Sequence, residues 1–161
     1  MVEVKVAGIA LDDRSKTPIV ILQEISGNRV LPIWIGPNEA SSIAMELAGK
    51  KFQRPLTHDL MKTMIEGLSA SVTRVVITEL RENTFYAKIL LTRQTEILAI
   101  DARPSDSIAL AVRVKSPIFV APELLGPEKA QEQELTAEER AEALKRHLRE
   151  MNPEDFGKFS M

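Results

Sequence analysis

The sequence predicts an α+β domain in which a mixed, largely antiparallel sheet carries three packed helices, followed by a C-terminal helical tail. Over residues 1–125, short β-rich runs joined by polar turns alternate with three segments whose apolar residues recur at helical spacing. With 161 residues, 44% hydrophobic and 27% charged, the chain can bury the core of one ordinary domain. Residues 126–161 are more polar and acidic, so we expect a linker and a charged helix there.

The first third of the chain predicts three antiparallel strands. Residues 3–11 alternate between polar and apolar side chains, and β-rich runs follow at 17–25 and 29–35. Residues 26–28 (Ser-Gly-Asn) form a turn between the last two runs, because Gly and Asn tolerate positive φ. Trp34, the sole tryptophan, lies in an apolar run and is expected in the core.

Three helices are expected from the apolar spacing. The first runs from Asn38, which would cap it, to about residue 48. The second begins at Thr57, whose hydroxyl is expected to accept backbone N–H groups, and ends near Gly67. The third covers residues 104–114, where apolar residues on most sides predict burial.

Four more β-rich runs are expected as strands. Residues 72–80 and 85–92 are joined by the polar residues 81–84 and predict a hairpin. Residues 96–100 predict a further strand, and residues 118–120 a short strand or extended edge.

The C-terminal part predicts one more helix, from the capping box at Thr136 to about Met151. Its apolar residues form a narrow seam about two heptads long, which we expect to dock on its own domain or on a second subunit. Because this seam and the exposed strand edges need cover, a homo-oligomer is expected, with a dimer favoured.

Composition excludes several kinds of site. The chain has no cysteine and two histidines, so disulfides, zinc–thiolate sites, thiol nucleophiles and a three-histidine metal site within one chain are excluded. A metal site would depend on carboxylates, which suits Mg²⁺ or Mn²⁺. No apolar run is long enough to span a membrane and the N-terminus does not resemble a signal peptide, so a cytoplasmic location without membrane contact is expected.

Charge alone does not predict nucleic-acid binding. The net charge is −2; residues 1–125 carry 15 Lys and Arg against 14 Asp and Glu, and residues 126–161 carry 6 against 9. A local basic patch is compatible with these totals, but aromatic residues at 4% give little support to recognition by base stacking. No P-loop, GxGxxG, GxSxG or HExxH motif is present.

The residues suited to chemistry gather at helix starts. Residues 54–59 contain four candidates: Arg54, Thr57, His58 and Asp59. Residues 101–106, between a strand and a helix, contain four more: Asp101, Arg103, Ser105 and Asp106. Glu39, in the first turn of the first helix, is a further candidate. The N–H groups at a helix start favour phosphate, and the helix dipole there favours a neutral imidazole that can act as base, ligand or donor.

Each cluster also has a structural interpretation. Asp59 and Glu39 would complement helix dipoles, Asp101 or Ser105 would cap the third helix, and Arg103 would pair with Asp106. In the functional interpretation, Asp101 and Asp106 share a Mg²⁺ ion that activates water while Arg103 stabilises charge on a phosphate. The choice between the structural and the functional interpretation depends on whether residues 54–59 and 101–106 face each other.

Four segments resemble the bifunctional nuclease domain family: residues 29–36 (RVLPIWIG), 54–60 (RPLTHDL), 83–87 (NTFYA) and 101–110 (DARPSDSIAL). The likeness covers residues 3–125. It implies a mixed α+β fold, activity on both DNA and RNA with little sequence preference, and, in plants, an association with stress and defence responses. The site it implies draws on eight residues: Arg54, Thr57, His58, Asp59, Asp101, Arg103, Ser105 and Asp106.

Our leading interpretation is a metal-assisted, sequence-tolerant nuclease. Its catalytic candidates are His58, Asp59, Asp101 and Asp106, with His58 or a metal-bound water as the base. Its substrate-binding candidates are Arg54, Thr57, Arg103 and Ser105, and its metal candidates are Asp101, Asp106 and Glu39, with Asp59 as a further ligand. The alternative is a non-catalytic anion- or nucleotide-binding, or oligomeric regulatory, module.

Overall fold

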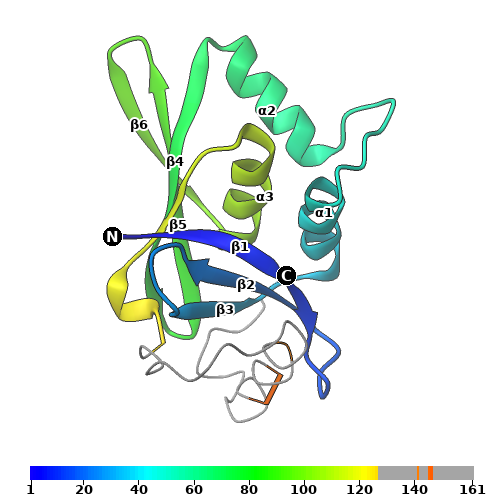
Figure 1. Cartoon of the computed structure of the whole chain (residues 1–161). Coiled ribbons are helices and arrows are strands. Elements are labelled where there is room, and N and C mark those ends of the chain that lie inside the picture. The colour runs from blue at the N-terminus through cyan, green and yellow to red at the C-terminus, as the bar shows by residue number, and fades with distance from the viewer. Residues whose placement is uncertain (127–140, 142–144, 147–161) are drawn as a thin grey trace.

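The structure, a computed structural model, describes residues 1–126, 141 and 145–146. The strands are β1 (Val2–Leu11), β2 (Pro18–Glu24), β3 (Val30–Trp34), β4 (Ala70–Arg81), β5 (Thr84–Arg93), β6 (Glu96–Ala102) and β7 (Ile118–Val120). The helices are α1 (Pro37–Leu47), α2 (Thr57–Gly67) and α3 (Pro104–Val114), followed by a short 3₁₀ helix η1 (Pro122–Leu124). The strands form one sheet of order β3-β2-β1-β7-β4-β5-β6, with the three helices on one side of it (Figure 1). The predicted α+β fold class is confirmed.

The sheet is built from two antiparallel halves joined by β7. β1, β2 and β3 form one half and β4, β5 and β6 the other, as the alternating sequence patterns predict. β7 pairs antiparallel with β1 and parallel with β4. A parallel neighbour cannot be reached through a tight turn, so the chain crosses over through α3 between β6 and β7. This crossover fixes α3 against the sheet.

α3 is the central helix of the domain. It contacts β4 and β5 on one side and both α1 and α2 on the other (Figure 1). Eight of its 11 residues are buried, as the apolar residues on most of its sides predict. The first turn of α3 is therefore enclosed between the sheet and the two outer helices.

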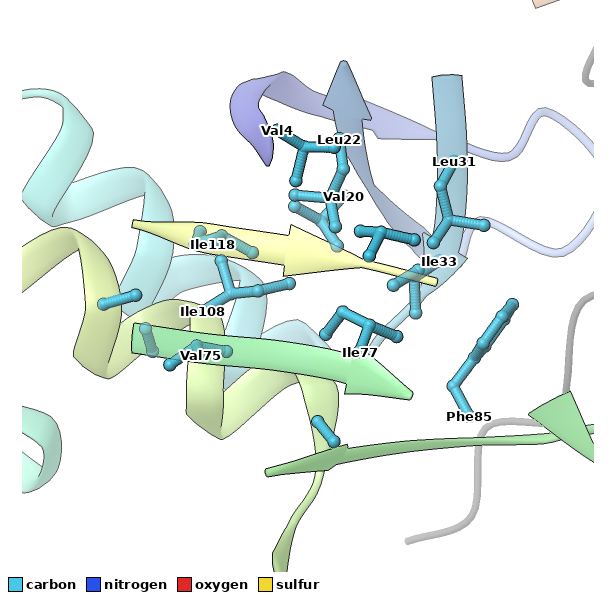
Figure 2. Close-up of a cluster of buried hydrophobic side chains, with 14 of the residues drawn as sticks. Val4, Val20, Leu22, Leu31, Ile33, Val75, Ile77, Phe85, Ile108 and Ile118 are labelled. Atoms are coloured by element: carbon cyan, nitrogen blue, oxygen red, sulfur yellow. The ribbon is translucent and has the colours of Figure 1, made fainter. Parts of the chain in front are cut away.

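The main core lies between the sheet and the helices. Figure 2 shows Ile108 of α3 among side chains from both halves of the sheet, including Val75 and Ile77 of β4 and Val20 of β2. A smaller cluster, on the other face of β2 and β3, consists of Ile19, Ile21 and Trp34. The expected burial of Trp34 is confirmed, and its indole Nε1–H donates to Asp12 at 3.1 Å.

At the starts of α1 and α2, the N-cap residue differs from the predicted one. Gly36 is the N-cap of α1, because Pro37 supplies the fixed φ and the missing N–H that suit the first helical position. Asn38 therefore lies inside the helix. Leu56 is the N-cap of α2, and the Asp59 carboxylate accepts the Leu56 N–H at 2.9 Å. Thr57 is already helical, so its predicted capping role is wrong.

The third helix start also departs from the predicted capping. Arg103 is the N-cap of α3, without a side-chain capping hydrogen bond, and Pro104 follows it as the first helical residue. Neither Asp101 nor Ser105 caps this helix. The predicted C-terminal helix and its apolar seam lie outside the described residues except for 141 and 145–146. The division of the chain at residue 125 stays a prediction.

None of the helices formed by the described residues has the length and hydrophobicity to cross a membrane.

We expect Ile108→Ala to lower the free energy of unfolding by about 2–5 kcal/mol, because the truncation leaves a cavity where α3 meets the sheet. The measurement is urea unfolding followed by circular dichroism. Ile25→Ala is the matched control, since Ile25 is 54% exposed and Ile108 fully buried. A loss of similar size in both variants would contradict the central position of α3 in the core.

Candidate functional site

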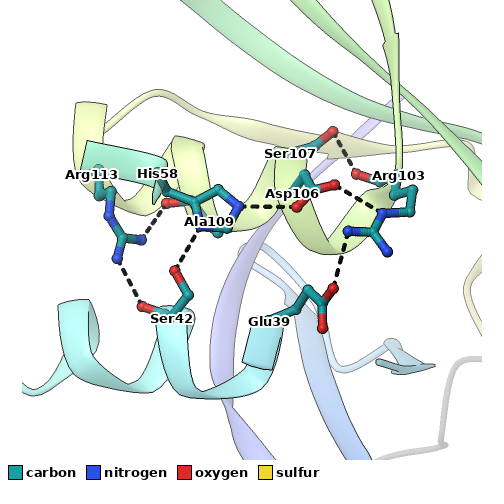
Figure 3. A network of polar contacts seen from close by, with 8 residues as sticks. All are labelled: Glu39, Ser42, His58, Arg103, Asp106, Ser107, Ala109 and Arg113. Carbon is teal, nitrogen blue, oxygen red and sulfur yellow. Dashed lines mark hydrogen bonds and ion pairs between the residues drawn. The ribbon is translucent and has the colours of Figure 1, made fainter. Parts of the chain in front are cut away.

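A chain of polar contacts links the first turns of all three helices. Glu39 lies in the first turn of α1, His58 in the first turn of α2 and Asp106 in the first turn of α3. Arg103, the N-cap of α3, connects Glu39 with Asp106, and His58 reaches Asp106 from the other side (Figure 3). The structure therefore brings together the helix starts that the sequence singles out, and the 54–59 and 101–106 segments do face each other through His58 and Asp106.

His58 is buried with both ring nitrogens in hydrogen bonds. Nε2 lies 3.0 Å from Oδ1 of Asp106, and Nδ1 lies 2.8 Å from Oγ of Ser42 in α1. The hydrogen bond from His58 lowers the pKa of Asp106, reinforced by Arg103 and opposed by burial. An ionised carboxylate only accepts hydrogen bonds, so Nε2 must carry the proton. In the neutral ring, Nδ1 then accepts the hydrogen bond that the Ser42 hydroxyl donates.

Arg103 is the most exposed charged group of the network. Its Nε donates to Oδ2 of Asp106 at 2.9 Å and its Nη2 to Oε1 of Glu39 at 3.0 Å. The Asp106 carboxylate raises the pKa of Arg103, so the guanidinium stays charged. Its side chain is 51% exposed. Because a guanidinium has five N–H groups and two are used here, the rest remain free to bind an anion.

Arg113, in the last turn of α3, forms a second, buried set of contacts. Its Nε donates to Oδ1 of Asp59 at 2.8 Å, its Nη1 to the carbonyl of Ala109 at 2.8 Å, and its Nη2 to the carbonyl of Ser42 at 3.0 Å. Together these contacts tie α1, α2 and α3 around one guanidinium. The Leu56 N–H and Arg113 lower the pKa of Asp59 against the effect of burial.

The other predicted site residues lie in different environments. Arg54 and Thr57 are exposed at the start of α2, whereas Ser105 is buried in the first turn of α3. Asp59 does not bond to Arg54 but to Arg113, through which it reaches Ser42 and the rest of the network. Ser105 is therefore largely buried, whereas Arg54 and Thr57 are accessible.

Asp101 does not join Asp106. On β6, Asp101 pairs with Lys88 and the next residue, Ala102, pairs with Ala87, which is buried in the core. Directly paired residues share a face of a sheet and successive residues alternate between faces. Asp101 therefore projects from the outer face, away from α3. The suggested sharing of a metal ion by Asp101 and Asp106 is not supported, because the sheet lies between their side chains.

The remaining carboxylates do not form a complete metal cage. In the part of the chain that the structure describes, no three His, Asp or Glu side chains form a group that could hold a metal ion. Glu39 and Asp106 do lie together, on either side of the Arg103 guanidinium. Mg²⁺ is commonly bound by one or two carboxylates when waters and substrate phosphates complete its shell. The predicted Mg²⁺ or Mn²⁺ therefore stays a prediction, and of its predicted ligands Glu39 and Asp106 are the two that Arg103 holds close together.

The sequence interpretation missed Ser42 and Arg113. The sequence does contain a signal for Arg113, because it is the single charged residue in the apolar run 108–114 (Ile-Ala-Leu-Ala-Val-Arg-Val). A charge on a helix with apolar residues on most sides must find a partner when the helix is buried. Ser42 carries no such signal, because serine is common on helix surfaces.

These features define a class of protein: a mixed α+β domain with an acid–base and guanidinium cluster at the starts of its helices. A family model of the bifunctional nuclease domain matches residues 20–133. The chain belongs to this family, as its motifs indicate.

The relatives fall into two groups. Uncharacterized protein MT1877 of Mycobacterium tuberculosis is 41% identical over 164 residues, which cover 97% of this chain and 98% of that protein. Bifunctional nuclease 1 of Oryza sativa subsp. indica is 30% identical over 105 residues, covering 63% of this chain and 32% of that protein. Bifunctional nuclease 1 of Arabidopsis thaliana is 27% identical over 114 residues, covering 68% of this chain and 35% of that protein. The match thus spans about a third of each plant protein.

We expect Asp106→Asn to lower the free energy of unfolding by about 1–3 kcal/mol at pH 7, because the variant loses a carboxylate hydrogen-bonded to two partners. The pKa of Asp106 in the folded chain is below its ordinary value of 3.8. Its stabilising effect is therefore present in full above that value and is lost as the pH falls through the lower, folded-state pKa.

The measurement is urea unfolding of wild type and Asp106→Asn between neutral pH and the acid limit of the native state. The difference between the two proteins should shrink as the pH falls below 3.8. Asp101→Asn serves as the control, because Asp101 is exposed on the outer face and should change stability little at any pH. A difference for Asp106→Asn that is constant over the whole range would refute the stabilising role of its charge.

Proposed function

We propose that this chain is a nuclease that hydrolyses phosphodiester bonds of DNA and RNA with little sequence preference. Membership of the bifunctional nuclease domain family and the names of the plant relatives support the reaction class. The observation that carries the proposal is the half-exposed guanidinium of Arg103 beside the carboxylates of Asp106 and Glu39. A cation that can bind phosphate and a carboxylate that can accept a proton are two groups that a hydrolytic site uses.

Arg103 is the proposed phosphate clamp. Its free N–H groups would bind the non-bridging oxygens of a phosphodiester and stabilise the charge that develops there in the transition state. Arg54, exposed in the loop before α2, would hold a neighbouring phosphate. Thr57, also exposed, would donate a further hydrogen bond from the first turn of α2.

Asp106 is the proposed general base for the attacking water. Its carboxylate would accept a proton as the water oxygen attacks phosphorus, and the bond to the leaving oxygen breaks as that oxygen takes a proton from solvent. His58 is then a positioning residue, because both its ring nitrogens are occupied and its Nε2–H fixes the orientation of Asp106. This differs from a role for His58 as the base itself, in which Nδ1, here hydrogen-bonded to Ser42, would have to take the proton of the attacking water.

A divalent cation would be an addition to this site. Glu39 and Asp106 are the residues that would hold Mg²⁺ or Mn²⁺, with substrate phosphates completing its shell. When bound, the ion would lower the pKa of a coordinated water. This matters because the lowered pKa of Asp106 makes its carboxylate a weak base.

A second function is favoured by a specific observation. In the described network, Asp106, Glu39 and Asp59 are each paired with an arginine or a histidine. Such pairing is typical of a cluster that holds helices together and leaves Arg103 as an anion site without catalysis. A non-catalytic anion- or nucleotide-binding, or regulatory, module is therefore the competing proposal.

We expect the purified protein to cleave single- and double-stranded DNA and RNA in Mg²⁺ or Mn²⁺ and to lose this activity in EDTA. Asp106→Asn and Arg103→Ala should each reduce the rate about a hundredfold or more, because a proton acceptor or a charge-stabilising donor is removed. The measurement is release of labelled fragments, with circular dichroism to show that each variant is folded.

Asp101→Asn and Arg93→Ala are the matched controls, since both residues are exposed on strands away from the network. They should keep the wild-type rate. Equal activity in all preparations would reveal a contaminating nuclease. Absence of cleavage under every metal condition, with binding of the same oligonucleotides retained, would replace the nuclease proposal with the binding module.

We also propose that two copies of the chain associate through β6. This edge strand exposes Ile97 (75%), Leu98 (38%) and Ile100 (45%), and an apolar edge strand invites pairing with another strand. Light scattering should give the mass of a dimer for wild type and of a monomer for Ile97→Lys. Met64→Lys, a charge placed on exposed apolar surface of α2, should keep the dimer. A monomeric wild type would remove the proposal.

A further inference from the structure

The loop between α1 and α2 has an unusual charge for this chain. Residues 48–56 contain Lys50, Lys51 and Arg54 and no acidic residue, although the whole chain has a net charge of −2. All three cations are exposed. Lys51 makes a long contact of 3.8 Å to Glu46, and its side chain is 82% exposed. The loop is therefore a local basic patch.

A cavity of about 290 Å³ lies under this loop. Its lining includes Phe52 and Gln53 from the loop, Met45 from α1, and Asp59 and Arg113 from the site network. The volume is just below the roughly 300 Å³ at which the usual range of small-ligand pockets begins. Phe52 is 50% exposed, so its ring both lines the cavity and is open to solvent.

The charges around the cavity suit an anionic ligand that carries an aromatic ring. The carboxylate of Asp59 is neutralised by Arg113 at 2.8 Å and accepts the Leu56 N–H at 2.9 Å, so it offers little repulsion to an anion. The other charged residues of the lining are Glu46, which faces Lys51 at 3.8 Å, and the cations Lys50 and Lys51. An aromatic ring next to flexible cations is the arrangement by which proteins hold single-stranded nucleic acid, with stacked bases and neutralised phosphates.

We propose that residues 50–54 and the cavity beneath them bind one unpaired nucleotide of a single-stranded nucleic acid. Phe52 stacks on the base, and Lys50, Lys51 and Arg54 contact the flanking phosphates. This inference rests on the proposed function for its ligand class. A base pair within a duplex is already stacked on both sides, so a ring at this position selects an unpaired base.

The cavity also has a physical connection to the catalytic candidates. Arg113 forms part of its lining and donates to the carbonyl of Ser42. The hydroxyl of the same Ser42 bonds to His58, which holds Asp106. A strand held at the loop therefore binds on the same three-helix assembly as the proposed phosphate clamp, Arg103.

The test is binding of a fluorescent 12-nucleotide oligo(dT) strand, measured by anisotropy in EDTA so that no cleavage occurs. Phe52→Ala should weaken binding about tenfold or more, whereas Phe52→Tyr should restore it, because stacking requires the ring. Leu60→Ala, which truncates another exposed apolar side chain, is the matched control and should bind as wild type does.

Two further arms test the phosphate contacts and the strand preference. The double variant Lys50→Ala/Lys51→Ala should reduce the slope of log K against log salt by about 1.4, since each phosphate contact on a single strand contributes about 0.7. Lys16→Ala/Lys115→Ala, at exposed lysines of other loops, should leave the slope unchanged. A blunt duplex of the same length should bind more weakly than the single strand.

Equal binding by Phe52→Ala and Leu60→Ala, or equal binding of duplex and single strand, would overturn the proposal. No measurable binding by wild type, or free thymidine monophosphate competing as strongly as the strand, would also overturn it. Binding that depends on Phe52 in a protein that never cleaves would leave this site in place and refute only the nuclease. The binding and cleavage proposals therefore fail separately.

Discussion

The buried guanidinium of Arg113 is the constraint on which the arrangement of the helices depends. A charge in this position, with its side chain 3% exposed, must be neutralised and fully hydrogen-bonded. Its partners come from all three helices: the Asp59 carboxylate of α2, a carbonyl of α1 and a carbonyl of α3. Because these contacts fix α1 and α2 against α3, they also set the separation between His58 and Asp106, and thereby the geometry of the candidate site.

Arg103 and Arg113 carry the same guanidinium group, and the difference in their burial gives them different roles. Both lie on α3 or at its start and both pair with an aspartate from the first turn of a helix. Arg113 is buried and its contacts hold the helices together, so little of its hydrogen-bonding capacity faces solvent. Arg103 is half-exposed and keeps donors free. An anion from solution can therefore engage Arg103 without unfolding the helix packing that Arg113 maintains.

Most of the fold could be predicted because its elements are locally consistent. Alternating strands, polar turns and apolar helical spacing fall where the structure has them, and Pro37 and Pro104 begin two of the helices. The helix caps were harder to predict. At the start of α2 the Asp59 side chain, and not that of Thr57, accepts the backbone N–H of Leu56, and this depends on the direction in which each side chain points. The site was predicted in part: Glu39, His58, Arg103 and Asp106 meet, but Asp101 faces outward because strand register decides its face. Register is a tertiary property that spacing along the chain does not encode.

The pairing of charges in the network also suggests how substrate and chemistry are coupled. Arg103 donates hydrogen bonds to both Glu39 and Asp106, and its positive charge lowers the attraction of this carboxylate pair for a cation. A phosphodiester competes for the same guanidinium, since phosphate and carboxylate suit its geometry equally. In the proposed nuclease, a turn of Arg103 toward the phosphate would remove part of this positive charge from the pair, so that both carboxylates would be better ligands for Mg²⁺ and Asp106 would be a stronger base. Substrate binding would thus create the electrostatic conditions for hydrolysis. A site in which Arg103 kept its carboxylate partners would bind the anion without hydrolysing it.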